Sequence, residues 1–361
     1  MKFQPILRET IWGGHKLEPL LSGGAASSRQ IGEAWIAWDG LTVANGPCQG
    51  RTLAETVEED PVALLGERLS ERYAGRFPLL VKLIDAHDSL SVQVHPDDSY
   101  AQEREGQPFG KSEVWLVLDA APDATIIHGM KRPVSADTIA AAVQAEELGP
   151  LMETVPVAPG DVVYNSAGTV HALGKGIFIY ELQQSSDLTY RLYDWGRRQA
   201  DGTSRELHVD KSIDVMIRDP FARHKIRPVD LPGDGFQSRL LCACNHFAAE
   251  WLRVKSPVGL STEYRRFDVL TVLNGSVEVL SGSNDPVGVS TGESVLIPSG
   301  LGSYGVRPSE GESVLVKAYV PDLLRDVVLP LREHGVSDTD ILQLGGDTAG
   351  NDVAKVLSPE S

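Results

Sequence analysis

The chain has 361 residues, enough for two or three domains with substantial cores, and 42% hydrophobic with 23% charged residues is an ordinary globular composition. The formal net charge of −17 argues against nucleic acid or an anionic membrane as partner, and no run is apolar enough to cross a bilayer. The start MKFQPILRETIWGG lacks the apolar core of a signal peptide, and three cysteines cannot form a disulfide framework, so we expect a cytoplasmic protein. An anionic substrate would need a locally basic site against this acidic background.

The predicted elements are mostly short strands. Alternating apolar runs bounded by Gly and Pro are typical of an all-β sandwich or barrel. In chain order, we expect a helical segment at 52–69, strands at 78–85, 89–95 and 112–119, a helix at 136–149, strands at 161–166 and 176–182, and a helical segment at 206–217. After residue 320, the pattern predicts two short helices at 321–344, broken near Gly335 and with Ser337 and Asp340 as a capping pair, followed by a polar tail.

An internal repeat indicates how the strands are organised. Residues 159–172 (PGDVVYNSAGTVHA) align with residues 291–304 (TGESVLIPSGLGSY), and the earlier strands 112–119 and 267–274 also match. The first copy is longer by about the length of its helical insert. We therefore predict two related β-barrels, the first enlarged by helical insertions. The expected domains are a catalytic domain at residues 1–245, a metal-free domain at residues 246–320 and a helical, mobile extension at residues 321–361.

Four polar side chains in the first copy could share one site. In the stretch VQVHPDDSY (92–100), Gln93 and His95 lie on one face, because alternate residues of an extended chain point the same way. Glu113 and His171 lie on two further segments of the same copy, whereas the second copy has Ser303 at the position of His171. Imidazole nitrogens with carboxylate and amide oxygens suit Zn2+ or another divalent first-row ion. The pattern predicts one metal ion per chain, although structural histidines with a buried ion pair are an alternative.

Six stretches also carry a resemblance to a known family: WGG (12–14), GEAW (32–35), VKLIDAHDSLSVQVHPDD (81–98), GKSEVWLVLD (110–119), TVHAL (169–173) and ELQQSSDLTYRLYDW (181–195). They resemble, in order and from Met1 to about residue 320, the cupin-fold mannose-6-phosphate isomerases in their short bacterial form. The resemblance implies two cupin (jelly-roll β-barrel) domains, a metal held by His95, Glu113 and His171 with Gln93 as a further ligand, and a catalytic Arg191. The implied reaction interconverts mannose 6-phosphate and fructose 6-phosphate through a cis-enediol. The chain departs from the family pattern at His87, where asparagine is expected.

Three lysines are candidates for contacts with the substrate. Lys111 lies two residues before Glu113 and shares its strand face, so it is a catalytic candidate rather than only a surface lysine. Lys82 interrupts the apolar run LLVKLI, where a lysine is costly unless it is paired or used. It is either a substrate contact or part of a buried ion pair. Lys131, after HGM, is a further candidate for substrate binding.

Acidic residues near Arg191 complete the predicted catalytic set. Asp187 lies four residues before Arg191 and is placed to orient its guanidinium, unless the two form only an exposed ion pair. Glu181 shares a strand face with Gln183 and is a candidate acid–base group for the proton transfer.

Two other functions are compatible with these residues. A sugar-phosphate-binding regulatory cupin could use the metal structurally, and an iron cupin dioxygenase could use two histidines and a carboxylate as ligands. Four protein ligands would leave few open positions for oxygen, which counts against the dioxygenase. The sequence favours a metal-dependent isomerase acting on a small sugar phosphate and does not indicate an oligomeric state.

Overall fold

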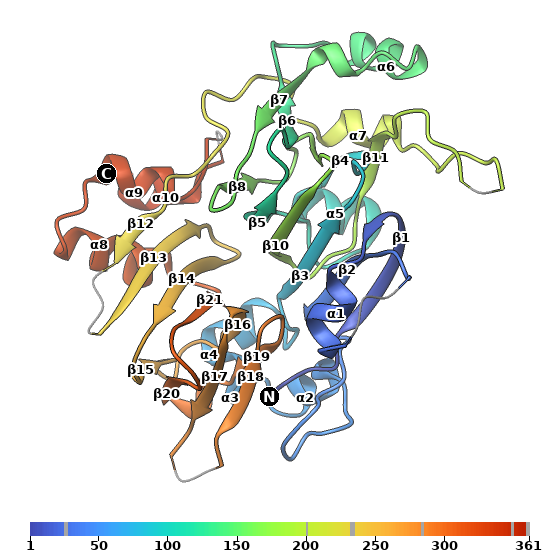
Figure 1. Ribbon diagram of the computed structural model, residues 1–361. Helices are drawn as coiled ribbons and strands as arrows, with labels where there is room; N and C mark the ends of the chain where they lie inside the picture. Colours follow the sequence, from blue (N-terminus) through green and yellow to red (C-terminus); the bar gives the residue numbers. More distant parts are fainter. Residues whose placement is uncertain (25–27, 200, 232–234, 283–284, 348–349, 359–361) are drawn as a thin grey trace.

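The computed structural model describes residues 1–24, 28–199, 201–231, 235–282, 285–347 and 350–358. Within these ranges the strands form four sheets, two from each half of the chain, and the second half, coloured yellow to red, occupies the lower left of Figure 1. A mainly β fold was predicted and is confirmed. No helix of the described part is long and apolar enough to cross a membrane.

The first half of the chain forms a six-stranded and a five-stranded sheet. The six-stranded sheet has the order β1 (Ile6–Gly14), β2 (Ile31–Ala37), β3 (Leu79–Ala86), β10 (Ile177–Gln184), β5 (Glu113–Ala120) and β8 (Val162–Asn165). The five-stranded sheet has the order β11 (Tyr190–Tyr193), β4 (Val92–Val94), β9 (His171–Leu173), β6 (Thr125–Met130) and β7 (Met152–Pro156). Strands β3, β5, β8 and β10 lie where the sequence predicted them, with ends that differ by one or two residues.

The centre of the six-stranded sheet is buried and fixes the register of three polar side chains. All eight residues of β3 (LLVKLIDA) are buried, because its aliphatic side chains pack on both faces of the sheet. Strand β10 pairs antiparallel with β3 and with β5, which sets Glu181 opposite both Lys82 and Trp115. Directly opposite residues of antiparallel strands share a face. The sheet register alone therefore brings these three side chains together.

The strand predicted at 89–95 is shorter in the structure, where β4 covers only Val92–Val94. The carbonyl oxygen of Ser89 accepts a hydrogen bond from Arg197 Nη1 at 2.6 Å, and that of Leu90 accepts one from Trp195 Nε1 at 2.7 Å. These side chains come from the segment after β11. They bind the backbone oxygens of Ser89 and Leu90, so these oxygens are not available for pairing with a neighbouring strand.

The second half also forms two sheets. The six-stranded sheet has the order β12 (Val229–Leu231), β13 (Phe236–Ala243), β14 (Ala248–Val254), β21 (Ser313–Tyr319), β16 (Asp268–Asn274) and β19 (Ser294–Ile297). The four-stranded sheet has the order β15 (Val258–Ser261), β20 (Ser303–Pro308), β17 (Ser276–Leu280) and β18 (Val287–Ser290). Strands β12 and β13 precede residue 245 but pair within this half. The sheets therefore begin the second half near residue 229, earlier than the predicted boundary at 245.

The repeat found in the sequence corresponds to equivalent strand positions. The order β3-β10-β5-β8 in the first half matches β14-β21-β16-β19 in the second. The aligned segments 159–172 and 291–304 contain β8 and β9 in one case and β19 and β20 in the other. Glu113 and Asp268 each begin the equivalent strand, β5 or β16.

The helices lie in inserts and at the C-terminal end. Those before β12 are α1 (Leu17–Ser22), α2 (Leu53–Glu59), α3 (Pro61–Leu65), α4 (Glu67–Arg72), α5 (Asp98–Glu105), α6 (Ala136–Gln144), η1 (Gly149–Leu151) and α7 (Val209–Val215). The predicted segment 52–69 is divided because Asp60 ends α2 and caps α3, and because Gly66 then interrupts the chain at φ +88°.

The C-terminal extension is more ordered than predicted. It contains the π-helical turn η3 (Leu323–Val328), α8 (Leu329–Glu333), α9 (Asp338–Gln343) and α10 (Asp352–Leu357), and a short turn η2 (Ser299–Leu301) precedes it. The expected cap is confirmed, since Ser337 accepts from the Asp340 backbone N–H. Helix α10 was not predicted. Asn351 caps it, and Val353 is fully buried in the main core. Residues 359–361 of the predicted mobile tail lie outside the described residues.

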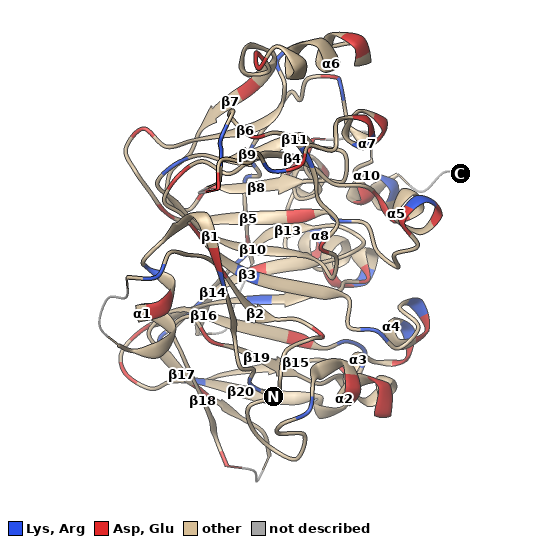
Figure 2. Ribbon diagram, turned by 90° about the vertical axis from the view of Figure 1, so that its right-hand side faces the viewer, with Lys and Arg blue, Asp and Glu red and all other residues tan. Residues whose placement is uncertain are grey.

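The main hydrophobic core joins the two halves. It includes Leu79 and Leu182 from the first half, Leu240 and Tyr319 from the second, and Leu331 from the C-terminal helices. Separate clusters fill the space between the sheets within each half. Figure 2 shows mostly uncharged strands, with charged residues gathered on α2, α4, α5 and α7 and on the loops. Charged residues inside a strand are thus exceptions, and several of them meet in one cavity.

Candidate active site

A cavity of about 1000 Å3 opens in the first half of the chain. Its lining comes from β1, β2, β3, β5 and β10 of one sheet and from β4 and β9 of the other. This volume lies at the upper end of the range for small-molecule sites. The cavity contains most of the predicted site residues and several acidic and basic side chains that sequence reasoning did not assign.

Three of the predicted metal ligands lie close together at the ends of β4, β5 and β9. His95 follows β4 directly, Glu113 begins β5 and His171 begins β9, and all three are almost fully buried. His95 Nε2 lies 3.4 Å from Glu113 Oε2, and His171 Nε2 lies 3.2 Å from Glu113 Oε1. One potential ligand atom from each residue lies within 4.8 Å of the other two. Two nitrogens and one carboxylate oxygen at this spacing fit a divalent first-row ion.

The hydrogen bonds of the two histidines fix their orientation. His95 Nδ1 donates to the carbonyl oxygen of Leu188 at 2.9 Å, and His171 Nδ1 donates to that of Thr169 at 2.8 Å. A carbonyl oxygen only accepts, so each Nδ1 carries the proton and each Nε2 presents a lone pair toward Glu113. Metal-ligating histidines are held in this way by a partner on the far nitrogen. The arrangement therefore supports the metal interpretation over that of structural histidines.

Burial and nearby charge set the protonation of this cluster. Burial, with a smaller effect of Lys111, lowers the pKa of His95 to about 3, and burial also lowers the pKa of His171. Burial alone would raise the pKa of Glu113, but Lys111 and His171 hold it well below its usual value. Neutral imidazoles and an ionised carboxylate are the states that a metal ion requires.

Lys111 lies beside the cluster, as its position two residues before Glu113 predicted. Its Nζ is 2.9 Å from Glu113 Oε2 and 3.1 Å from His95 Nε2. Gln93 lies opposite His171 across β4 and β9, and its Nε2 donates to Ser91 Oγ at 3.2 Å. Gln93 therefore lines the cavity, and its role as a fourth ligand stays a prediction.

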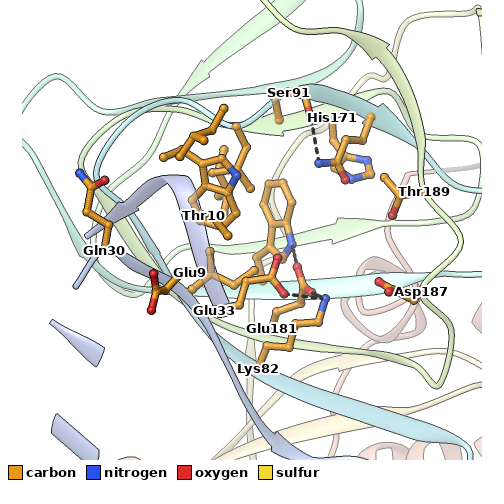
Figure 3. Close-up of a pocket in the computed structure, with 18 of the residues that line it drawn as sticks. Glu9, Thr10, Gln30, Glu33, Lys82, Ser91, His171, Glu181, Asp187 and Thr189 are labelled. Carbon is orange, nitrogen blue, oxygen red and sulfur yellow. Dashed lines mark hydrogen bonds and ion pairs between the residues drawn. The ribbon is translucent and has the colours of Figure 1, made fainter. Parts of the chain in front are cut away.

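Lys82 forms the centre of a second polar group in the same cavity. Its Nζ lies 3.3 Å from Glu181 Oε1 and 3.6 Å from Glu33 Oε2, as Figure 3 shows. Glu181 Oε2 accepts a hydrogen bond from Trp115 Nε1 at 2.9 Å. Lys82 is therefore in a buried ion pair and also lines the cavity, and its contact with the substrate stays a prediction.

The two glutamates that share Lys82 differ in acidity. Burial raises the pKa of Glu181, and the negative charge of Glu113 adds to this increase, although Lys82 opposes it. Burial acts in the same direction on Glu33, but Lys82 and the Trp35 indole N–H hold the pKa of Glu33 below its usual value. Two carboxylates whose pKa values are pushed apart are typical of acid–base sites.

Not every predicted residue lies at the cavity. Asp187 is exposed and lines it, near Thr189 in Figure 3. Arg191 is half-buried on β11, is absent from the described lining, and donates through Nη1 to the backbone oxygen of Glu206 at 2.8 Å rather than to Asp187. Lys131 follows β6 with an exposed side chain and also lies outside the described lining. The structure therefore brings neither Arg191 nor Lys131 to the cavity wall, and their roles stay predictions.

Sequence reasoning missed several cavity residues. Glu33 lies in the stretch GEAW, which contributed to the resemblance. A charged residue within the otherwise apolar strand β2 was the signal that could have identified it. Glu9, Arg29 and Arg205 also line the cavity but come from the edge strand β1, from the segment before β2 and from the long connection after β11. His87, the departure from the family pattern, is exposed with its ring centroid 6.4 Å from that of His15. Its described ring contact is with His15 and not with a predicted metal ligand.

The fold and this site together define a cupin-type β-barrel protein with a buried cluster suited to a metal ion. Residues 1–122 match the family model "Phosphomannose isomerase type I, catalytic domain". The chain is 36% identical to mannose-6-phosphate isomerase ManA of Bacillus subtilis (strain 168), over 84% of this chain and 94% of the relative. It is 33% identical to a mannose-6-phosphate isomerase of Streptococcus mutans, over 83% and 93%. The chain belongs to the type I mannose-6-phosphate isomerase family.

Solved structures agree with this assignment. The mannose 6-phosphate isomerase of Bacillus subtilis superposes with a TM-score of 0.78 at 29% identity, over 88% of this chain and 98% of that one. Phosphomannose isomerase of Salmonella typhimurium superposes with a TM-score of 0.68 at 16% identity, which shows the fold alone. The recognition made from the six sequence stretches is confirmed.

Proposed function

We propose that the chain is a metal-dependent isomerase that interconverts mannose 6-phosphate and fructose 6-phosphate. The observation that carries the proposal is one cavity, in a chain of this family, whose lining includes Glu113 and His171 of the His95–Glu113–His171 cluster together with the Lys82–Glu181 pair. The names of the relatives favour this activity over a regulatory cupin or a dioxygenase.

The proposed cofactor is one Zn2+, or another divalent first-row ion, held by His95, Glu113 and His171 with Gln93 as a further ligand. The nitrogen and oxygen donors and the fixed histidine tautomers support this choice. When bound, such a cation would polarise the oxygens of the substrate.

The reaction moves one proton between C2 and C1 of the sugar and another between the two oxygens. We assign the carbon-bound proton to Glu181, which would remove it from C2 as a base and return it to C1 as an acid. The raised pKa and the burial of Glu181 support this role. Lys111 and Lys82 are proposed to donate hydrogen bonds to oxygens that gain negative charge in the enediol-like transition state.

Arg191 remains in the proposed catalytic set because it matches the family motif, and Asp187 remains because it lines the cavity. Replacing Arg191 with lysine keeps the charge but removes the planar fork, so turnover should fall by about tenfold with a smaller change in KM. Steady-state kinetics with mannose 6-phosphate measure both constants. A raised KM with unchanged turnover would reduce Arg191 to a binding residue.

The second half of the chain is proposed to be a metal-free cupin barrel with a structural role, starting near residue 229. Asp268, the counterpart of Glu113, is fully buried and accepts a hydrogen bond from the Tyr304 hydroxyl at 2.7 Å. Ser303, the counterpart of His171, is exposed. The Glu250–Lys317 pair joins β14 to β21 at 2.8 Å, reversing the order of charges of the Lys82–Glu181 pair on β3 and β10. These contacts support a barrel that has a buried ion pair like that of the first half but a serine at the position of His171.

A coupled assay tests the proposed reaction directly. Fructose 6-phosphate formed from mannose 6-phosphate would be converted to a dehydrogenase signal, in the presence of added Zn2+ and after treatment with a chelator. Metal-dependent formation of fructose 6-phosphate is the expected result. Binding of the sugar phosphate without turnover would favour the regulatory cupin instead.

A further inference from the structure

Two arginines bind one buried carboxylate, Asp194, in the segment that follows β11 (Asp194 to Arg205; yellow-green in Figure 1). Asp194 Oδ1 accepts hydrogen bonds from Arg197 Nη2 at 2.7 Å and from Arg205 Nη2 at 2.6 Å. The positive charge of Arg191 also acts on this cluster, because it is electrostatically coupled to Asp194, Arg197 and Arg205. The cluster is therefore locally basic in a chain with a net charge of −17.

Arg205 is the member of the cluster that lines the large cavity. Its Nε and Nη2 bind the two oxygens of Asp194 at 2.8 Å and 2.6 Å, a bidentate pairing that fixes the plane of the guanidinium. These hydrogen bonds to described residues do not use Nη1, so that edge of the fork is available to a ligand. Only about a fifth of the Arg205 side chain is exposed, so it is largely desolvated.

The other cations of the cavity wall differ from Arg205 in their partners. Among the described lining residues, Lys82 is paired with Glu33 and Glu181, and Lys111 with Glu113. Arg29 is paired with Glu9 and with Glu18. Of these carboxylates, all but Glu18 also line the cavity. Asp194, the partner of Arg205, lies outside the described lining. Arg205 thus brings positive charge to the cavity, and its described ion pair is with a carboxylate outside the lining. Electrostatic attraction of an anion is strongest at such a position.

The segment that carries Arg205 is attached to the strand that leads to the metal cluster. Arg197 Nη1 and Trp195 Nε1 bind the backbone oxygens of Ser89 and Leu90, immediately before β4. Burial would raise the pKa of Asp194, but the hydrogen bonds from Arg205 and Arg197 hold it below its usual value, so the carboxylate stays charged. Arg205 is therefore held in a fixed place relative to His95.

We propose that Arg205 is the anchor for the phosphate group of the substrate, and that Asp194 is the positioning residue that orients its guanidinium. The inference rests on the proposed function and identifies the part of the site that recognises a phosphate monoester. Planar guanidinium groups bind phosphate oxygens through directed hydrogen bonds, whereas Lys82 and Lys111 are more deeply buried beside glutamates and are assigned to the oxygens of the enediol.

The test measures binding of an unreactive probe, a hexitol 6-phosphate, together with the kinetics of mannose 6-phosphate. Arg205→Gln should weaken probe binding and raise KM by about ten- to a hundredfold, the range for loss of a charge-assisted hydrogen bond, with a smaller change in kcat. Arg205→Lys should lie between this variant and the unaltered protein. Probe affinity of Arg205→Gln within about twofold of the unaltered protein would overturn the proposal.

Arg198→Gln is the matched control. Arg198 lies in the same segment, is exposed, and donates to the backbone oxygen of Gly202 away from the described cavity lining. The same loss of charge there should leave probe binding and KM unchanged. Equal effects of the two substitutions would mean that only the overall charge of the segment matters, and would also overturn the assignment of Arg205.

The role of Asp194 is tested by a double-mutant cycle. Asp194→Asn should weaken binding of the hexitol 6-phosphate in the unaltered protein, but should add little in the Arg205→Gln background, because the residue it orients is already gone. Equal effects of Asp194→Asn in both backgrounds would show that Asp194 does not act through Arg205.

Different experimental results would contradict the proposed function and the proposed phosphate anchor. If the unaltered protein binds the hexitol 6-phosphate through Arg205 but does not form fructose 6-phosphate, the proposed reaction fails and the anchor stands. If mannose 6-phosphate is isomerised and Arg205→Gln leaves both binding and KM unchanged, the anchor fails and the reaction stands.

Discussion

Replacing His171 with alanine is expected to remove both bound metal and isomerase activity. His171 supplies one of two neutral imidazole nitrogens to the cluster, and Glu113 with His95 would remain as two strong ligands. Loss of a group that merely orients a ligand already lowers metal affinity by about 10–100-fold, so loss of a ligand itself should lower it by more. Activity should fall by about a thousandfold or more. Metal content per chain, measured by atomic spectroscopy after dialysis, is the primary readout.

His87→Asn is the control for His171→Ala. His87 is an exposed histidine outside the cluster, and asparagine is the residue that the family resemblance implies there. This variant should keep its metal and its activity. Full metal occupancy in His171→Ala would contradict the ligand assignment, and an active His171→Ala protein without metal would contradict the dependence of the reaction on metal.

Strand periodicity, the comparison of the two repeat copies and the family resemblance together predicted the cluster of His95, Glu113 and His171. Gln93 and His95 share a face because alternate residues of a strand do so, and the comparison of the two repeat copies separated His171 from Ser303. The register of β10 with its two neighbours then places Glu181 beside Lys82. These are local properties of strands, and a sequence records them directly.

Residues on connections were harder to predict. Arg205 reaches the cavity only because Asp194, eleven positions earlier, binds its guanidinium after the intervening segment has turned back. No periodicity encodes such a contact. Lys131, after the stretch HGM, has an exposed side chain outside the described lining, a placement that the sequence did not indicate. Long side chains on loops are placed by tertiary contacts, which a single sequence does not show.

The repeat alignment did not include every strand of the second half, and the domain boundary near residue 245 stays a prediction. The repeat alignment used β16, β19 and β20 of the second half, whereas β12 and β13 precede the aligned segments. Those two strands pair with β14 and add an edge to the second six-stranded sheet. A repeat therefore located the equivalent cores but not the additional edge strands.

Glu181→Gln is expected to lower kcat by about 10²–10⁴-fold while the metal stays bound, because the amide cannot accept the proton from C2. The substitution is nearly isosteric and keeps an oxygen that can accept the hydrogen bond from Trp115. Glu33→Gln is the matched control, since Glu33 contacts the same Lys82 from the other side. It should lower kcat much less, because its pKa is held below the usual glutamate value and an ionised weak base is a poor proton acceptor.

The pH profile separates a base from a merely structural carboxylate. A base must be ionised, so the activity of the unaltered protein should decrease as the pH falls through the pKa of Glu181, which burial raises above the usual glutamate value. Glu33→Gln should keep this acidic limb of the profile. The residual activity of Glu181→Gln should lack it, because the group that titrates is gone. A larger loss of kcat in Glu33→Gln than in Glu181→Gln, with the acidic limb retained in the latter, would transfer the proton-transfer role from Glu181 to Glu33.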